Sequence, residues 1–307
     1  MKKLAICIPT YNELDYLKRN LDSLIPQVKS FNKNVDLYVI DNSSTDGTNE
    51  YVNKLFAKIS NCYYRKNESN IGLYKNQLRC FQIEGYDYKI ILGSDDVILE
   101  NSISVILSHL GNKFSILCMN YFSFKDNYRE PYQVYAPENN LTFDRAYDLL
   151  NAPTVGHYSA FIFKSEFVDK YLNILIKKYD EEIYIINRGI INFLAAYICH
   201  NESNQTFFIG KRCLATNFSK QVTYNSLSHL CIDYLDRYHL LYKDGIGTKN
   251  DFLYRKRLIS KSILKASLRN LPFMDNKEII SVEKKLLFYF SDSILLKFFI
   301  IIGYFLM

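Results

Sequence analysis

The feature that most constrains the fold is a pattern that repeats in the first hundred residues. An apolar strand, a polar loop and a helix follow one another three times before a fourth strand, which predicts strands at residues 3–8, 35–40, 62–65 and 88–92. Apolar runs this continuous are typical of parallel strands that are covered on both faces. The alternation therefore predicts an α/β fold with a mostly parallel, Rossmann-like sheet flanked by helices.

The intervening and later segments follow from the same periodicities. Leucines at helical spacing predict a helix from Leu14 that ends near Pro26, and further helices are expected over 48–59 and after Asn70. Beyond residue 100 the pattern predicts strands at 114–119, 159–164 and 207–210, a loop at 126–140, and helices at 166–178 and 183–197. After about residue 225 the chain is expected to be wholly helical.

An acidic motif follows the fourth strand, where Leu92 leads into Gly93, Ser94, Asp95 and Asp96. Asp is a poor strand residue and Gly-Ser favours turns, so the acids should lie just beyond the strand's C-terminal end. In open α/β sheets, ligands bind at that edge. Paired carboxylates suit Mn²⁺ or Mg²⁺, with substrate phosphates completing the shell. Alone, the motif is better explained as a solvated turn that caps the next helix.

Polar loops also follow the other strands, and a parallel sheet would gather all of them into one crevice. They are Pro9-Thr10-Tyr11-Asn12, the run from Asp41 to Thr48, and Asn70-Ile71-Gly72 with Asn76. Singly, Asp46 and Asn70 are explained as helix caps and Asp41 as a turn former. Their convergence is what predicts a ligand site.

Composition sets broader bounds. The 307 residues are 48% hydrophobic and 23% charged, which is ordinary for a globular protein. Seven cysteines without a CxxC pair or zinc spacing indicate reduced thiols in a cytosolic protein. The N-terminal apolar run is too short for a signal peptide.

In order and spacing these motifs resemble the family 2 glycosyltransferases, and bacterial surface-polysaccharide sugar transferases among them. That family has the GT-A fold and moves a sugar from a nucleotide diphosphate sugar with inversion at the anomeric carbon. The resemblance implies a catalytic domain over 1–222, with a nucleotide-sugar-binding half at 1–100 and an acceptor half at 101–222. A helical region at 223–307 completes the expected organisation.

The resemblance also implies roles for single residues. Asp41 matches the acid that binds the base, usually uracil, and Asp96 matches the acid that coordinates Mn²⁺ or Mg²⁺. Asp95 is expected to contact the ribose or the sugar, and Ser94 at the motif's first position departs from the family pattern. The nucleotide-binding residues expected in this way are Pro9, Thr10, Tyr11, Asn12, Asp41, Asn70, Gly72, Asn76, Ser94 and Asp95.

The general base is harder to place. The family carries it in an acidic pair well after the metal motif, and Glu181 and Glu182, with Arg188 six residues after Glu182, resemble that arrangement. Glu182 is the predicted base, with Glu181 as a neighbour that raises its pKa by like-charge repulsion. A solvated helix start explains both acids equally well. His157 is an alternative base, and the segment with His157 and Ser159 resembles the family's acceptor-side strand.

The C-terminal third suggests a membrane surface. From Lys249 to Arg269, seven Lys or Arg residues stand against one acid, Asp251, with Leu and Ile between them at roughly helical spacing. Such a segment suits anionic lipid, and no nucleic-acid-binding motif accompanies the charge. The final apolar run, Ile294–Met307, is short for a membrane span. It is expected to be an interfacial anchor, or a helix packed on the catalytic domain or on a second subunit.

Together these features predict an inverting transferase on the inner face of the cell membrane. Its donor would be a UDP-sugar and its acceptor a lipid-linked glycan or surface polysaccharide. Two alternatives stay open, a non-catalytic scaffold that binds a nucleotide sugar and a nucleotidyltransferase. The second normally needs a glycine-rich basic loop after the first strand, which residues 9–13 do not supply. The sugar, the linkage, the metal and the oligomeric state are not determined by the sequence.

Overall fold

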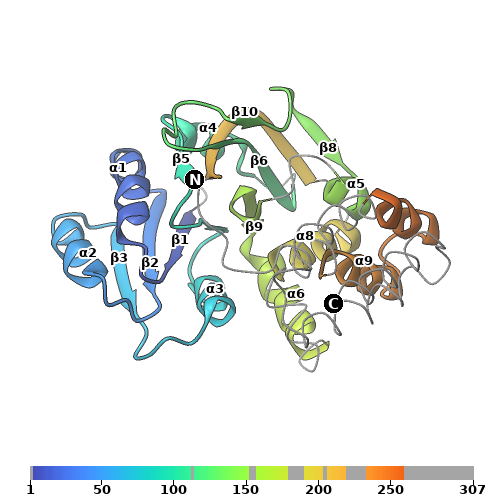
Figure 1. The fold of residues 1–307 in the computed structure, drawn as a ribbon, viewed down its shortest axis with the longest axis horizontal. Helices are drawn as coiled ribbons and strands as arrows, with labels where there is room; N and C mark the ends of the chain where they lie inside the picture. Colours follow the sequence, from blue (N-terminus) through green and yellow to red (C-terminus); the bar gives the residue numbers. More distant parts are fainter. Residues whose placement is uncertain are drawn as a thin grey trace, which may run out of the picture. The chain divides into compact units, whose positions relative to one another are not determined.

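A computed structural model describes the protein over residues 3–111, 114–151, 157–178, 190–202, 206–218 and 233–258. The chain forms two compact units, one from Met1–Glu181 and Ile190–Lys220, the other from Glu182–Gly189 and Gln221–Met307. The first unit is the mixed α/β fold that the sequence predicts (Figure 1).

A ten-stranded sheet forms the centre of the first unit, in the order β3-β2-β1-β4-β9-β6-β10-β5, with β7 on β6 and β8 on β10. The predicted parallel strands are present as β1 (Leu4–Thr10), β2 (Val35–Asp41), β3 (Cys62–Lys66) and β4 (Tyr88–Ile91). The later strands are β5 (Val97–Ile98), β6 (Ile116–Phe124), β7 (Gln133–Val134), β8 (Leu141–Phe143), β9 (Phe161–Lys164) and β10 (Thr206–Asn217).

Strand direction decides where a site can form. β9 is antiparallel to both β4 and β6, and β6 is parallel to β10. Hence β1, β2, β4, β6 and β10 all run the same way, and their C-terminal ends share one edge of the sheet. The short helical turn η2 (Tyr158–Ala160), which leads into β9, approaches the same edge.

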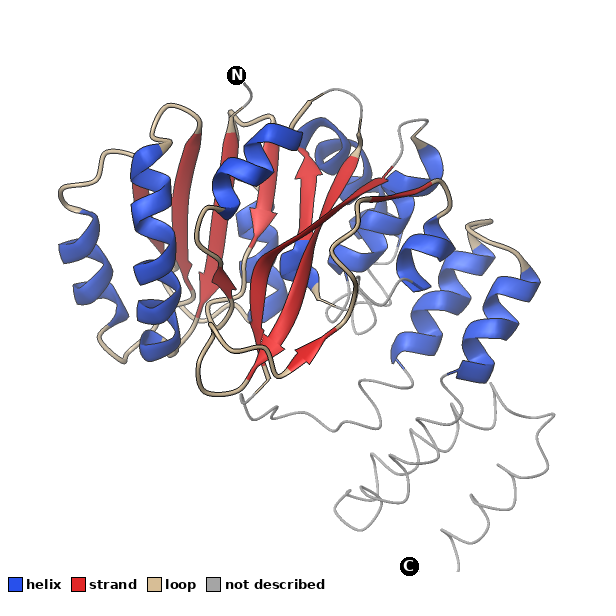
Figure 2. Cartoon of the chain, turned by 90° about the horizontal axis from the view of Figure 1, so that it is seen from above, coloured by secondary structure: helices blue, strands red, loops and turns tan. Residues whose placement is uncertain are grey.

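Helices cover both faces of the sheet (Figure 2). Successive strand residues point to opposite faces, so Leu4, Ile6 and Ile8 pack in one core with α1, α2 and α4, while Cys7 faces Cys80 of α3. On that second face α6 packs on β9 and α8 on β6. The helices are α1 (Leu14–Ser30), α2 (Thr48–Phe56), α3 (Leu73–Phe81), α4 (Ser102–His109), α5 (Ala146–Asn151), α6 (Ser165–Lys178) and α8 (Ile190–Asn201).

The predicted end of the first helix near Pro26 is wrong, because α1 continues to Ser30. Proline removes one helical hydrogen bond, but the last turn gains more from tertiary contacts. Val28 is fully buried, and the Gln27 amide donates to the carbonyl of Leu99 at 3.0 Å. The loop expected at 126–140 contains β7, and the strand expected at 207–210 is the twelve-residue β10.

Two register shifts interrupt β10 between Ile209 and Leu214, and a bulge of this kind bends a strand. Gly210 lies within the first shift, where the chain passes so close that a Cβ there would lie 2.3 Å from the carbonyl carbon of Asn139. The amide of Asn120 donates to the carbonyls of Gly210 at 2.7 Å and Pro137 at 3.1 Å. The bend therefore depends on glycine at this position.

The second unit is helical where it is described, with α9 (Asp233–Lys243) and a helix at 249–258. The ring of Phe252 contacts those of His239 and Tyr242, with centroids 5.5 and 6.0 Å away. The rest of the predicted basic and apolar tail, from residue 259, lies outside the described residues.

The close approach at Gly210 predicts the effect of one methyl group. Gly210→Ala should lower the free energy of unfolding by about 2 kcal/mol or more, because the backbone at Asn139 must move and the Asn120 bonds weaken. Denaturant unfolding measures this. Gly111→Ala is the matched control, because a Cβ there meets nothing within 4 Å, and it should change stability by less than about 0.5 kcal/mol. Equal effects of the two substitutions would contradict the close packing.

Candidate active site

A buried carboxylate marks the predicted nucleoside pocket. Asp41, at the end of β2, is fully buried and accepts hydrogen bonds from the Ser44 amide at 2.9 Å and from the hydroxyls of Ser44 and Tyr64, each at 2.5 Å. Burial and the bond to Asp41 raise the pKa of Tyr64 well above its usual value. Thr10 pairs with Asp41 across the strands, and its buried hydroxyl has no hydrogen-bond partner in this structure. An acceptor and an unpaired hydroxyl side by side suit a nucleobase edge.

Four asparagines form a network behind this pocket. Asn42 donates to Asn70 at 2.7 Å, while Asn67 donates to Asn42 at 3.1 Å and to Asn76 at 2.8 Å. Asn76 is 2% exposed and donates to the Ile40 carbonyl at 2.9 Å, so its contacts here are architectural. Asn70 also accepts from the Gly72 amide, which fixes the start of α3. The roles predicted for these residues in nucleotide binding stay predictions.

The loop after β1 is held against the loop after β2. Asn12 has a left-handed φ of 52°, donates through its amide to Ser44 at 2.9 Å and accepts from the Thr45 amide at 2.8 Å. Pro9 is buried within β1, whereas Tyr11 is 43% exposed beside this loop. The loop therefore carries one exposed aromatic residue, Tyr11, next to Thr10 in the sequence.

Asp46 bonds the starts of two helices, although the N-cap residues are Glu13 for α1 and Gly47 for α2. It accepts from the Leu14 amide at 2.9 Å and from the Thr48 hydroxyl at 2.6 Å, so it joins the starts of α1 and α2. Burial raises the pKa of Asp46, but these hydrogen bonds outweigh burial and hold it below its usual value.

Asp96 is the centre of the acidic motif and is fully buried. Its carboxylate accepts from the Ser159 hydroxyl at 2.6 Å and from the Asn217 amide at 3.3 Å. Nδ1 of His157 lies 3.3 Å from Oδ2 of Asp96 without a hydrogen bond between them. His157 and Ser159, predicted on the acceptor side, are thus in contact with the predicted metal ligand.

Several residues that position this loop were not predicted. Arg19 donates to the carbonyl of Asp95 at 3.2 Å, Asn20 donates to that of Gly93 at 3.0 Å, and Glu13 bonds the Ser94 hydroxyl. One signal was available, because Asn20 is a polar residue among the leucines that form the buried face of α1. Arg19 gives no such signal, since exposed arginines are common on helices.

Gly93 is required because the acidic loop closes tightly on itself. A Cβ there would lie 2.8 Å from Oδ2 of Asp96, 2.9 Å from the Tyr158 hydroxyl and 3.0 Å from Oδ1 of Asp95. Its amide donates to the Ser159 hydroxyl at 2.9 Å. Glycine therefore lets three polar side chains converge at the end of β4.

Burial dominates the electrostatics of Asp96 and raises the pKa of its carboxyl to about 6. The nearby His157 lowers this pKa, Asp95 raises it, and the bonds from Ser159 and Asn217 lower it. A protein that only needed a turn here would gain stability from a neutral side chain. Keeping an ionisable group in such a place is typical of functional sites.

The donor set fits a divalent cation. Two adjacent carboxylates supply hard oxygen ligands, and the buried Nδ1 of His157 next to Asp96 makes no hydrogen bond. A bound cation would also favour the ionised form of Asp96 against burial. Among the described residues no three His, Cys, Asp or Glu side chains form a complete metal-binding group. Asp95 and Asp96 are the residues that would hold the ion together with substrate phosphates.

The predicted base is not placed, because Glu181 and Glu182 lie outside the described residues. Nothing in the structure tests their role.

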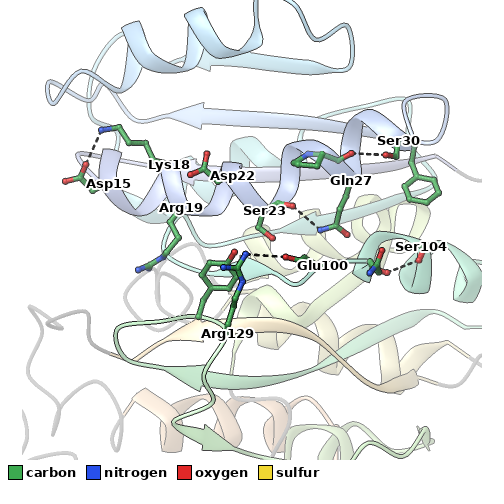
Figure 3. A pocket seen from close by; sticks show the side chains of 14 residues that line it. Asp15, Lys18, Arg19, Asp22, Ser23, Gln27, Ser30, Glu100, Ser104 and Arg129 are labelled. Carbon is green, nitrogen blue, oxygen red and sulfur yellow. Dashed lines mark hydrogen bonds and ion pairs between the residues drawn. The ribbon is translucent and has the colours of Figure 1, made fainter.

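A groove of about 930 Å³ follows α1 (Figure 3). Arg19 of α1 lies on its wall. Glu100 and Arg129 also line it, with Nη2 of Arg129 3.4 Å from Oε1 of Glu100. Its lining mixes acidic and basic side chains, and Arg19 connects it to Asp95.

A GT-A fold is defined by this arrangement, in which the buried Asp41 and the acidic motif lie on one edge of a mostly parallel sheet. The sequence profile described as glycosyl transferase family 2 matches residues 5–172, more than half of the chain. The chain therefore belongs to glycosyl transferase family 2, as predicted.

Curated proteins with similar sequences are also named as sugar transferases. The abequosyltransferase RfbV of Salmonella typhimurium is 36% identical over 121 residues, which are 38% of this chain and 35% of that protein. The uncharacterized glycosyltransferase MG025 of Mycoplasma genitalium is 32% identical over 113 residues, 36% of this chain and 38% of the relative. The matches thus span little more than a third of the curated relatives.

Solved structures share the fold at low identity. TarS of S. aureus (residues 1–349, with UDP-GlcNAc) has a TM-score of 0.61 and 16% identity, covering 94% of this chain and 80% of that one. The mannosyltransferase PcManGT of Pyrobaculum calidifontis, with GDP-Man and Mn²⁺, has a TM-score of 0.53 and 12% identity, covering 99% and 85%. Both show the GT-A fold that the sequence predicts.

The raised pKa of Asp96 predicts a pH dependence of stability. Its folded-state pKa of about 6 exceeds the usual 3.8, so the folded state holds the proton more tightly. The contribution of Asp96 to the free energy of unfolding is fully present below about pH 4. It is lost as pH rises through about 6, a loss of roughly 3 kcal/mol.

Unfolding free energies of wild type and Asp96→Asn, measured from pH 4 to 7, test this prediction. Wild type should lose stability relative to the variant across that range, because asparagine does not titrate. Parallel curves for the two proteins would contradict it.

Proposed function

We propose that the protein is an inverting glycosyltransferase that moves a sugar from a UDP-sugar to a hydroxyl of a lipid-linked or surface-polysaccharide acceptor. The observation that carries the proposal is the hydrogen-bonded connection between the Asp41 region and the acidic loop. Asn12 joins the loop after β1 to the Asp41 pocket through Ser44, and the adjacent Glu13 bonds Ser94 of the acidic loop. Nucleoside and diphosphate would thus be bound by a single rigid edge.

Similar proteins support the donor class. TarS is described in complex with UDP-GlcNAc and with UDP, and PcManGT in complex with GDP-Man and Mn²⁺. In this chain, Asp41 and Thr10 would bind the base beside Tyr11, while Asp95 and Asp96 would face the diphosphate. A divalent cation, when bound, would act as a Lewis acid that stabilises charge on the departing diphosphate.

The chain's own residues supply the remaining steps. Arg19 and Asn20 fix the backbone of the acidic loop, so the carboxylates keep their position during the reaction. Glu182 is the proposed base that takes the proton from the acceptor hydroxyl as it attacks, with Glu181 beside it. A single in-line displacement then inverts the anomeric carbon. His157, in contact with Asp96, is the alternative base.

Two other functions would use the same pocket. A nucleotidyltransferase would need basic groups around the loop after β1, but residues 9–13 contain none. A non-catalytic scaffold would bind a nucleotide sugar without turnover, and the retained buried acid at Asp96 is an argument against it.

Titration calorimetry with UDP, GDP and CDP, each with and without Mn²⁺, tests the donor site. We expect UDP to bind with Mn²⁺ and Asp96→Ala to weaken that binding at least about tenfold, because the variant removes a ligand of the diphosphate-bound metal. Glu84→Ala, which removes an exposed acid from another part of the chain, is the control and should bind as wild type.

UDP release from UDP-GlcNAc in the presence of candidate acceptors then separates transferase from scaffold. Binding without turnover by the folded protein would support the scaffold. Absence of binding to all three nucleotides would overturn the proposed function.

We also propose that the second unit attaches the protein to the inner face of the cell membrane. On the helix at 249–258, Tyr254 is 55% exposed and Leu258 46% exposed, and they share a face with the exposed Arg257. Aromatic, aliphatic and basic groups on one face suit an anionic lipid surface. Across the described ranges, no helix is both long and apolar enough to cross a bilayer.

Sedimentation with vesicles tests the membrane proposal. Wild type should bind vesicles rich in phosphatidylglycerol more tightly than pure phosphatidylcholine, and Arg257→Glu should weaken binding about tenfold. Lys33→Glu makes the same charge change at an exposed position of the first unit and should have a smaller effect. Equal binding to both kinds of vesicle, or equal losses in the two variants, would contradict the proposal.

A further inference from the structure

Two exposed aromatic rings lie together at the edge of the sheet that carries the candidate site. Tyr132 is 51% exposed and Phe218 is 52% exposed, and their ring centroids are 5.0 Å apart. The ammonium of Lys125 lies 3.9 Å from the centre of the Tyr132 ring. We call Tyr132, Phe218 and Lys125 the aromatic shelf.

The backbone holds the shelf firmly. The amide of Tyr132 donates to the carbonyl of Ser123 at 2.7 Å, and the amide of Phe218 donates to that of Phe124 at 2.8 Å. Both acceptors lie in the last two residues of β6. The rings are therefore set on the ends of paired strands, and they stay exposed although folding could have buried apolar surface of this size.

The shelf adjoins a residue that contacts the acidic motif. Phe218 follows Asn217, whose amide lies 3.3 Å from Oδ1 of Asp96. Consecutive Cα atoms are about 3.8 Å apart, so the shelf begins one residue away from a contact of Asp96. Any group that attacks a sugar held at Asp95 and Asp96 must come within bonding distance of that sugar. The shelf lies where such a group has to be supported.

We propose that the aromatic shelf is the subsite for the acceptor's terminal pyranose, the ring that carries the attacking hydroxyl. This inference rests on the proposed function and names the substrate class bound on the acceptor side of the same site. A pyranose presents C–H groups on one face, which suit the electron-rich faces of aromatic rings, and hydroxyls around its rim. Lys125 supplies a hydrogen-bond donor beside the rings.

The size and rigidity of the shelf favour a sugar over other occupants. The two ring planes are inclined at 44° to each other, and their fixed strand positions suit a small rigid ligand. The groove along α1 is less suited to stacking, because charged side chains such as Glu100 and Arg129 line it.

Kinetics of single variants test the subsite. Phe218→Ala and Tyr132→Ala should each lower kcat/KM for the acceptor about tenfold, through a raised acceptor KM, since stacking and burial are lost there. The KM for UDP-GlcNAc and the affinity for UDP should not change. Tyr63→Ala is the matched control, because Tyr63 is also exposed and stacked on another ring, Tyr38, but lies on β3 at the opposite end of the sheet.

The absence of tryptophan from the chain allows a direct binding measurement. Phe218→Trp introduces a single reporter on the shelf and Tyr63→Trp introduces one far from it. With UDP at saturation, titration with methyl pyranosides and short oligosaccharides should change the emission of the first variant and leave the second unchanged.

The outcomes separate the two proposals. If none of UDP, GDP and CDP binds wild type, the proposed function fails and the subsite with it. If UDP binds but the shelf variants keep the wild-type acceptor KM, only the subsite is wrong. A response of Phe218→Trp to phosphatidylglycerol vesicles and to no sugar would also overturn it, in favour of a lipid contact.

Discussion

The burial of the Asp96 carboxylate is the constraint on which the rest of the site depends. A charged oxygen removed from water needs partners, and Asp96 finds them in segments far apart in the sequence, at Ser159 before β9 and Asn217 at the end of β10. Satisfying one carboxylate thus joins the loop after β4 to the turn before β9 and to β10. Because the pKa of Asp96 remains raised, this arrangement lowers stability at neutral pH and is better explained by ligand binding than by folding.

The acidic loop is rigid because neighbouring residues pack closely around it and bond its backbone. Gly93 permits a close approach that no other residue could make without displacing Asp95, Asp96 or Tyr158. Arg19 and Asn20 hold the loop through the backbone carbonyls of Asp95 and Gly93. The Asp41 pocket is fixed in a similar way by Ser44 and Tyr64. Positions fixed before the substrate arrives reduce the entropy that binding must overcome.

Local patterns were enough to predict the first four strands, the parallel sheet and the edge where Asp41 and Asp96 lie. Each of those strands is a continuous apolar run followed by turn residues, and a parallel sheet aligns their ends without further information. The strand β5 could not be predicted, because it has only two residues and exists through pairing with β10. The length of β10 depends on bulges at Gly210, which are set by contacts with a distant loop.

The site shows the same division between local and distant information. Motif spacing predicted Asp41, Asp95 and Asp96 as candidate residues, but no local pattern indicated that Ser159 and Asn217 would meet Asp96 or that Arg19 would hold its loop. Those contacts join residues 63 to 121 positions apart and depend on the folded topology. Pro26 shows the converse, since a local rule predicted a helix end that tertiary burial of Val28 overrode.

A crystal structure of the protein with UDP and Mn²⁺ would test the central claim most directly. The account predicts uracil between Asp41 and Tyr11, with the diphosphate and the metal at Asp95 and Asp96. A nucleotide bound in the groove along α1, with the carboxylate of Asp96 still fully enclosed, would contradict it.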